Sequence, residues 1–248
     1  MQLTTDAIVI GQKSIKENDR LITLLTREHG VIRAFANRAR QVSGRLSTAT
    51  QLLAFSDFVI YKGKSTYTVN SADVKKIFHK LFSDLNNLSL AQYFCELMTS
   101  LCPSEENTNE YLRLMLNSLH LLGEGKKNPM IIKAVFELRM MTLIGYMPNL
   151  VGCDKCGSYG GENMIFLYQS GHILCDSCEF SRNEPFYTLP LRVMTSMRHI
   201  CYSDFDKIFS FSLPDENAVM LKNASESYLL SKIDRGFNTL DFYNGIIK

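Results

Sequence analysis

The sequence contains no apolar run that approaches the roughly 20 residues needed to span a membrane. Its first residues, MQLTTDAIVIGQK, have neither the basic start nor the long apolar stretch of a secretory signal peptide. We therefore expect a cytoplasmic protein with no membrane partner. In a reducing cytoplasm, paired CxxC motifs are more typical of metal sites than of disulfides.

Recognisable catalytic motifs are also missing. The sequence has no P-loop, no G-x-G-x-x-G, no G-x-S-x-G and no H-E-x-x-H. Its five histidines are scattered, and its carboxylates form no recognisable pair. We expect a protein that is not an enzyme, although a catalytic group assembled in space from distant residues would leave no such motif.

The size and composition are those of a globular protein. The chain has 248 residues, of which 46% are apolar and 21% are charged. This length allows one large domain or two to three small ones, and it can bury a core without disulfides. The seven cysteines are therefore not needed to stabilise a small scaffold.

Charge is unevenly distributed, although the formal net charge is only +2. Residues 1–80 hold 13 Lys/Arg and 6 Asp/Glu, a net charge of +7, whereas residues 81–248 hold 14 and 19, a net charge of −5. A basic front part followed by an acidic remainder predicts a polyanionic partner for the front part.

Residues 1–80 have the pattern of a small antiparallel barrel or sheet. Five short runs rich in Val, Ile, Thr, Phe and Tyr are separated by polar or Gly breaks: TTDAIVIGQ, RLITLLT, GVIRAFA, LLAFSDFVIY and STYTVNSADV. Residues 38–51, RARQVSGRLSTATQ, contain three arginines and little apolar content. This segment predicts an exposed, mobile loop.

Cations in the β region are the candidate nucleic-acid contacts. They are Arg20, Arg27, Arg33, Arg38, Arg40, Arg45, Lys62 and Lys64. A solvated surface explains any single one of them, but the set is typical of small OB-type barrels that bind single strands through a charged groove and stacked aromatics. The aromatic residues available for stacking are Phe35, Phe58, Tyr61 and Tyr67. Strand alternation places some of these in the core.

From about residue 84 the apolar period becomes helical. NLSLAQYFCELMTSLC predicts a helix with Ser89 as a cap, and ENTNEYLRLMLNSLHLLGEG predicts a second. NPMIIKAVFELRMMTLIGYMP predicts a third helix, with Asn128 as cap and Pro129 at its first position. This helix is apolar on most sides and is expected to be buried. LPLRVMTSMRHICYS and DENAVMLKNASESYLLSKI indicate two more helices.

Four cysteines follow the spacing C-x2-C-x18-C-x2-C, which is typical of a tetrahedral zinc site. They are Cys153, Cys156, Cys175 and Cys178. The intervening runs MIFLYQ and HIL flank Ser-Gly and predict a hairpin that returns the second pair to the first. Four thiolates leave no open position for water or substrate, so the expected zinc is structural.

Other uses of the cysteines are less well supported. A redox pair would normally lie in a βαβ context, which is absent, and the symmetric spacing favours zinc over an iron–sulfur cluster. His172 is interpreted as a surface residue of the hairpin rather than a spare ligand. Cys95, Cys102 and Cys201 are expected in the core.

The chain as a whole resembles RecO, a family of bacterial recombination mediators. The resemblance rests on IKENDRLITLLTREHGVIRAFANRAR at residues 15–40, FELRMMTLIGYMPNLVGCDKCG at 136–157 and GHILCDSC at 171–178. It covers nearly the full length, and the Gly-Tyr-x-Pro sequence before the first CxxC is its most specific element.

The resemblance implies an α+β fold. An N-terminal OB-fold β-barrel would occupy residues 1–80, and an α-helical domain would occupy 81–149 and 182–248. A four-cysteine zinc ribbon holding one zinc ion would be inserted at 150–181.

The resemblance also implies a non-enzymatic function in DNA repair and homologous recombination. The protein would bind single- and double-stranded DNA, anneal complementary strands and help load the recombinase onto coated strands. The implied partners are RecR and the acidic, apolar C-terminal tail of the single-strand-binding protein, with a nucleoid-associated location.

The resemblance carries DNA contact to particular positions. Arg20 in ENDR, Arg38 and Arg40 in NRAR, and Arg45 match the basic elements of the family. Arg33, Lys62 and Lys64 remain candidates from the charge pattern. NRAR stands where the family usually has KGAR, so a lysine and a glycine are replaced, and the position of the charge and the loop geometry are expected to differ. Tentative contacts for the tail, placed among the helices without a residue-by-residue match, are Lys133 and Arg139.

Two other functions remain open from sequence. One is a helical protein-interaction scaffold with a structural zinc. The other is a zinc-dependent nuclease or hydrolase, which would require that fewer than four cysteines bind the metal.

Overall fold

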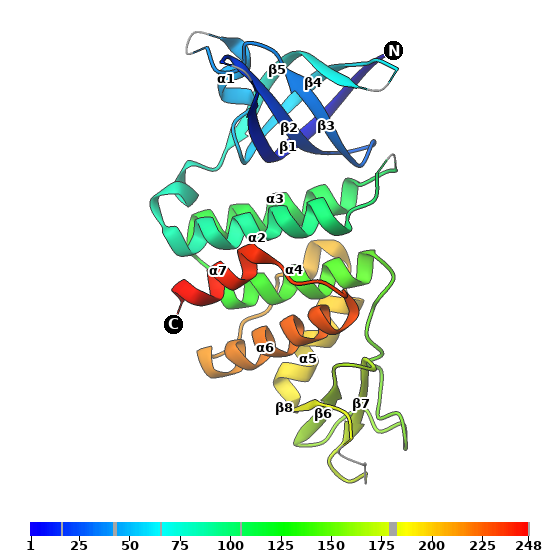
Figure 1. Cartoon of the computed structure of the whole chain (residues 1–248). Coiled ribbons are helices and arrows are strands. Elements are labelled where there is room, and N and C mark those ends of the chain that lie inside the picture. The colour runs from blue at the N-terminus through cyan, green and yellow to red at the C-terminus, as the bar shows by residue number, and fades with distance from the viewer. Residues whose placement is uncertain (16, 42–43, 65, 105, 179–182, 248) are drawn as a thin grey trace. The chain divides into compact units, whose positions relative to one another are not determined.

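The computed structural model of the chain describes residues 1–15, 17–41, 44–64, 66–104, 106–178 and 183–247. Its mixed α+β architecture agrees with the sequence prediction, and seven α-helices lie in the described residues. Figure 1 shows the elements in chain order. Two compact units are present: a barrel unit formed by Met1–Glu124 and Phe237–Lys248, and a ribbon unit formed by Gly125–Gly236.

Five strands of the barrel unit form a closed barrel in the order β1-β2-β3-β5-β4. The strands are β1 (Gln2–Ile15), β2 (Asp19–Thr26), β3 (Val31–Ala36), β4 (Ala54–Lys62) and β5 (Tyr67–Ile77). Antiparallel pairing of β1 with β4 closes the barrel, while β3 and β5 are parallel. The register of β1 against β2 shifts between Val9 and Gly11, and β1 continues past this point.

Alternation along each strand separates the barrel core from the outer wall. Successive side chains of a strand point to opposite faces, so every second residue can be apolar and buried. In β3, Ile32, Ala34 and Ala36 belong to the core, whereas Arg33 and Phe35 are exposed. The largest fully buried side chain of the barrel core is Phe58.

The segment 38–51 is not the exposed loop that its composition predicts. It contains helix α1 (Arg45–Ala49), and Ala39, Ala49 and Thr50 are fully buried. The alanine and threonine side chains are small, which allows this segment to pack closely against the barrel core although it has few large apolar residues. Val42 and Ser43, which the same prediction covered, lie outside the described residues.

The helices of the barrel unit are α2 (Leu85–Leu101), α3 (Asn109–Glu124) and α7 (Asn238–Ile246), with a short 3-10 helix η1 (His79–Ser83). Asp84, not Ser89, caps α2, because its carboxylate accepts the backbone N–H groups of Asn86 and Asn87. The sequence did not predict α7. It packs against α2, where Thr239 donates to Glu96 and Phe237 meets Tyr93 edge to face.

The ribbon unit contains α4 (Pro129–Leu143), α5 (Leu191–Tyr202) and α6 (Asp215–Lys232), with the short 3-10 helix η2 (Phe205–Lys207). As predicted, Asn128 caps α4 with its side chain and Pro129 opens it. The expected burial of α4 is also confirmed, because residues 131–138 are all buried. A three-stranded sheet in the order β7-β6-β8 completes this unit.

The compact units group the helices differently from the predicted segments 81–149 and 182–248. α2, α3 and α7 join the barrel, whereas α4, α5 and α6 join the sheet. The physical reason for the return of the last residues is the contact of α7 with α2. Helical periodicity locates helices along the chain, but it does not show which helices pack together.

Candidate metal centre and nucleic-acid interface

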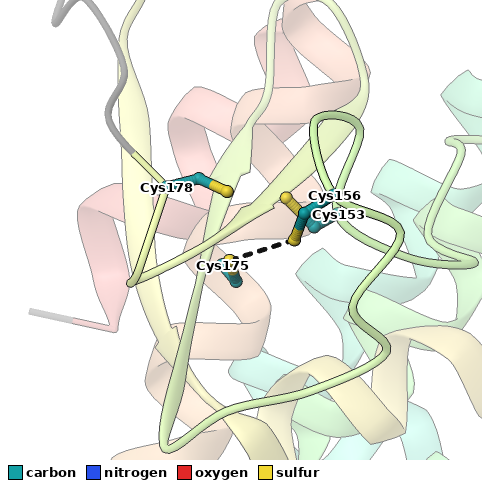
Figure 2. A group of neighbouring side chains, drawn as sticks. All are labelled: Cys153, Cys156, Cys175 and Cys178. Carbon is teal, nitrogen blue, oxygen red and sulfur yellow. Dashed lines mark hydrogen bonds between the residues drawn. The ribbon is translucent and has the colours of Figure 1, made fainter.

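All four cysteines of the paired motifs converge on one point in the ribbon unit. The Sγ atoms of Cys153, Cys156, Cys175 and Cys178 lie within 4.8 Å of one another and could hold a metal ion. Figure 2 shows the four side chains turned toward a common centre. Cys153 and Cys175 are buried, and Cys156 is exposed. Tetrahedral Zn–S bonds of about 2.3 Å require sulfur separations of roughly 3.8 Å, which this cluster can reach.

A tight turn positions the first pair of cysteines. The N–H of Gly157 donates to the carbonyl of Cys153 at 2.8 Å, and the N–H of Cys153 donates to the carbonyl of Ser158. Gly157 has a φ of +72°, a left-handed conformation that glycine adopts without a Cβ clash. At Gly152, a Cβ would stand 2.8 Å from the carbonyl oxygen of Gly157. Glycine at both positions therefore permits the turn.

A hairpin returns the second pair, as the sequence predicts. Strands β6 (Asn163–Leu167) and β7 (His172–Cys175) pair antiparallel, and Cys175 ends β7. Strand β8 (Phe186–Pro190), which the sequence reading missed, pairs with the other side of β6. It lies beyond the predicted end of the ribbon at residue 181. Aromatic Phe186 and Tyr187, with the β-branched Thr188, were a strand signal that could have extended the prediction.

Backbone hydrogen bonds favour the charged form of one cysteine. Burial alone would raise the pKa of Cys153, but the backbone N–H groups of Cys175, Cys156 and Lys155 lower it to about 6. Hydrogen bonding with Cys175 raises the pKa of Cys178 to about 12. Several adjacent thiolates repel one another, so the full four-thiolate form requires a cation at the centre.

His172 is a surface residue, in agreement with the sequence interpretation. Its side chain is exposed, and Nδ1 lies 3.2 Å from a carboxylate oxygen of Asp154. Cys95 and Cys201 are buried as expected, whereas Cys102 is only partly buried.

Five of the candidate DNA contacts are exposed cations of the barrel. They are Arg33, Arg38, Arg40, Lys62 and Lys64. Arg38 has a φ of +55°, and its backbone N–H donates to Asp19, while that of Arg40 donates to the carbonyl of Asn18. These backbone bonds fix the chain after β3 beside the β1–β2 turn and leave the two guanidinium groups outside.

Arg20 is only partly exposed and has a structural role. Its Nη1 donates to the carbonyl of Ser47 and to the hydroxyl of Thr50, at 2.9 and 3.0 Å. Desolvation, followed by the charge of Arg40, lowers the pKa of Arg20. Arg45 is the first residue of α1, and its side chain lies outside what the structure describes.

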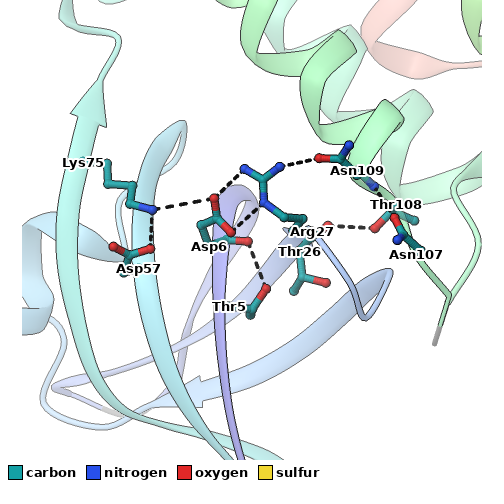
Figure 3. Close-up of polar contacts among 9 residues, drawn as sticks. All are labelled: Thr5, Asp6, Thr26, Arg27, Asp57, Lys75, Asn107, Thr108 and Asn109. Atoms are coloured by element: carbon teal, nitrogen blue, oxygen red, sulfur yellow. Dashed lines mark hydrogen bonds and ion pairs between the residues drawn. The ribbon is translucent and has the colours of Figure 1, made fainter.

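Arg27 belongs to the predicted basic set, but its charge is used inside the barrel unit. Its guanidinium donates to both carboxylate oxygens of Asp6, at 2.9 and 2.6 Å, and to the side chain of Asn109. Figure 3 shows this network, in which Lys75 also reaches Asp6 and Asp57. The hydrogen bond from Arg27 lowers the pKa of Asp6 from 3.8 to about 2, although burial acts in the opposite direction.

The four aromatic candidates divide as strand alternation predicts. Phe58 is fully buried and Tyr67 packs against the barrel core. Phe35 and Tyr61 are 36% and 52% exposed. Both exposed rings therefore belong to the outer wall of the barrel.

The two tentative tail contacts do not present free charges. Lys133 is 0% exposed and pairs with Glu137 and Glu226 at 2.5 and 2.7 Å. Arg139 donates to backbone carbonyls of Cys201 and Ser203 at 3.1 and 3.4 Å, and stacks on Phe205. Both side chains hold helices of the ribbon unit together. In this arrangement neither Lys133 nor Arg139 presents its charge to a partner protein.

No helix in the described part of the chain has the length and apolar character needed to cross a bilayer.

A barrel with exposed cations and a four-cysteine cluster together define a class of candidate DNA-binding proteins with a metal centre. Two family profiles match this chain: Recombination protein O N terminal at residues 1–78, and Recombination protein O C terminal at residues 82–241. The chain therefore belongs to the RecO family of DNA repair proteins, as the motifs in its sequence indicated.

Similar curated proteins carry the same name. The chain is 32% identical over 240 residues to the DNA repair protein RecO of Acetivibrio thermocellus, covering 97% of this chain and 95% of that protein. It is 30% identical to the DNA repair protein RecO of Symbiobacterium thermophilum, covering 96% and 94%. Its identity to the protein of that name from Caldicellulosiruptor bescii is 28%, covering 98% of both chains.

Replacement of Cys175 by Ser should abolish metal retention, because it removes a buried thiolate from the cluster. The metal content of the purified protein should fall from one divalent ion per chain to none. Heat should then expose residues 150–178 to protease before the barrel. Cys102→Ser, outside the cluster, is the matched control. Full metal retention by Cys175→Ser would contradict a four-cysteine site.

Replacement of Asp6 by Asn should destabilise the barrel unit by about 1 kcal/mol at pH 7, a figure reduced for solvent screening of the half-exposed Arg27. The folded-state pKa of Asp6 lies below its unfolded value. Its contribution is therefore complete above about pH 5 and is lost as the pH falls through 2. Urea unfolding measures the free energy of unfolding of wild type and variant, and the difference between the two should become smaller as the pH falls toward 3. Asp73→Asn, which removes an exposed carboxylate of β5, is the matched control.

Proposed function

We propose that this protein is a non-catalytic DNA-binding mediator of repair and recombination. It binds single- and double-stranded DNA, anneals complementary strands and assists loading of the recombinase onto coated strands. The observation that carries the proposal is the set of five exposed cations on the barrel of a chain that belongs to the RecO family. The strand order and the parallel β3–β5 pair support interpretation of the barrel as an OB-fold.

The exposed arginines and lysines would act on the phosphate backbone. Each cation that neutralises a phosphate releases a counterion, so binding is tight at low salt, weakens steeply as salt rises and has little sequence preference. Annealing follows from the same chemistry. Two complementary strands repel each other, and a cationic surface that neutralises both lowers the electrostatic cost of bringing them together.

The metal in this proposal is zinc, and its role is structural. Four cysteines whose Sγ atoms lie within 4.8 Å of one another suit zinc, and four thiolates would complete its coordination without a water or substrate position. The four cysteines would hold the turn at Gly157 against the end of β7. This arrangement argues against the nuclease alternative, since hydrolysis at zinc needs an open coordination position.

The partners in this proposal are RecR and the C-terminal tail of the single-strand-binding protein. The family membership supports them. An acidic, apolar tail requires a cation beside an apolar surface. Lys133 and Arg139 do not provide one in the described arrangement, because Lys133 is buried and Arg139 is bound to backbone carbonyls.

Charge reversal at Arg38 and Arg40, as Arg38→Glu with Arg40→Glu, should weaken oligonucleotide binding at least tenfold. The slope of log affinity against log salt should become shallower by about 1.4, since a single-strand contact contributes about 0.7 to that slope. Fluorescence anisotropy across a salt series measures both. The double variant Arg192→Glu with Lys207→Glu changes net charge equally in the ribbon unit and should retain both values. An unchanged slope after reversal at 38 and 40 would favour the scaffold alternative.

Annealing should proceed on complementary strands coated by the cognate single-strand-binding protein. It should slow when that protein lacks its C-terminal tail, because the mediator then loses its attachment to the coat. Annealing of bare strands, which needs only the barrel cations, serves as the control and should be unaffected. If annealing is equally fast with the complete and the tail-less single-strand-binding protein, the tail is not a partner of this protein.

A further inference from the structure

Two exposed aromatic rings face outward on one cross-strand row of the barrel. Phe35 on β3 is paired in register with Thr68 on β5, and Thr68 is paired with Tyr61 on β4. The neighbours of Phe35 in the chain, Ala34 and Ala36, are core residues, and so is Ile60 beside Tyr61. By alternation, both rings therefore project from the outer wall, separated only by the small side chain of Thr68.

One cation lies on the same wall as this row and another lies just beyond its end. Arg33 lies two residues before Phe35 on β3 and points to the same face. Lys62 follows Tyr61 on β4 and is paired with Tyr67, so its Nζ lies over the Tyr67 ring, 5.5 Å from the centroid, and not beside Tyr61. Lys64 is exposed just after the end of β4. An open groove lined by Arg33, Tyr67 and Thr99 begins beside this wall. Exposed aromatic rings among cations are complementary to a polyanion whose bases can be reached.

We propose that Phe35 and Tyr61 form a base-stacking platform for single-stranded DNA. This inference rests on the proposed DNA-binding function and adds to it the residues that distinguish a single strand from a duplex. Arg33 and Lys64 neutralise the phosphates that flank the stacked bases. Rings two strands apart are separated by roughly 10 Å at about 4.8 Å per strand, so they receive two bases that are not stacked on each other.

The spacing explains why a duplex does not bind in this way. Bases of a duplex are stacked at about 3.4 Å along each strand and leave no open π-face for a protein ring. A single strand can separate its bases and place one on each ring. The platform therefore adds affinity only for the single strand, whereas exposed cations attract both forms.

Stacking also has a consequence for annealing. A ring contacts the flat face of a base and makes no hydrogen bond to its edge, so the Watson–Crick edge of the stacked base stays free. A strand held in this way is kept extended and can pair with a complementary strand while bound. When the duplex forms, its bases stack on one another and leave the platform, which releases the product from this surface.

The chain contains no tryptophan, which allows a direct test of the platform. Phe35→Trp and Tyr61→Trp each introduce one fluorophore at a ring position. Oligothymidine should quench the tryptophan fluorescence of both variants, because a stacked base quenches an indole. A duplex of the same length, and an abasic strand that keeps the phosphates, should not. Phe82→Trp, exposed in the same unit but off the barrel wall, should not respond to oligothymidine.

Removal of the rings gives an independent readout. Phe35→Leu and Tyr61→Leu keep an apolar side chain but remove the π-face. Each should weaken oligothymidine binding roughly 5- to 100-fold by anisotropy, the range found for single aromatic stacking residues. Duplex affinity should stay within twofold of wild type, which also shows that the variants are folded.

The outcomes separate this inference from the proposed function. Oligothymidine binding by anisotropy without quenching at either position would overturn the platform and leave DNA binding intact. Equal quenching by duplex or abasic strand would overturn base stacking as the cause. Loss of duplex and single-strand affinity by the same factor in the leucine variants would overturn the selectivity. No binding of any DNA by the wild type would overturn the proposed function, and the platform with it.

Discussion

The ion pair between Arg27 and Asp6 is the contact on which the organisation of the barrel unit depends. It joins the turn after β2 to β1, next to the strand pairing that closes the barrel, and Arg27 also reaches the first residue of α3. Hydrogen bonds to the backbone connect the same two segments. The N–H of Thr108 donates to the carbonyl of Arg27, and the hydroxyl of Thr108 donates to the carbonyl of Thr26. A barrel wall and a helix N-terminus thus share one partly buried charge. Removing either partner would leave the other with a weaker partner, which is Lys75 for Asp6 and Asn109 for Arg27.

This constraint distinguishes two groups among the basic residues at positions 1–80. Arg27 and Lys75 balance Asp6 and Asp57, and Arg20 holds α1 through Ser47 and Thr50. Arg33, Arg38, Arg40, Lys62 and Lys64 remain on the surface. Net charge therefore overstates the cationic surface, because part of it is used to hold the fold together. In the ribbon unit, Lys133 and Arg139 are used in the same way.

Sequence predicted best those features that depend on local spacing. The two CxxC pairs, the cap of α4 by Asn128 and the alternation of β3 are set by neighbours a few residues away. It failed where packing partners are distant in the chain. The α1 segment has a polar composition, and its burial depends on contacts with Arg20 and the barrel core. Strand β8 is short and is defined by its pairing with β6. Likewise, nothing local shows that Lys133 faces Glu226, 93 residues away.

The exposed residues of β3 show why alternation matters for function as well as for the core. Ile32, Ala34 and Ala36 fill the barrel, and the same period of two places Arg33 and Phe35 together on the opposite face. A register shift of one residue would bury the arginine and expose the alanines. The apolar requirement of the core thus fixes which face of β3 presents the cation and the ring of the proposed DNA surface. Because the outward side chains of β3 do not fill the core, Arg33 and Phe35 can be replaced with little effect on the packing of the barrel. The surface of the proposed DNA contacts is thus separate from the core that holds the fold.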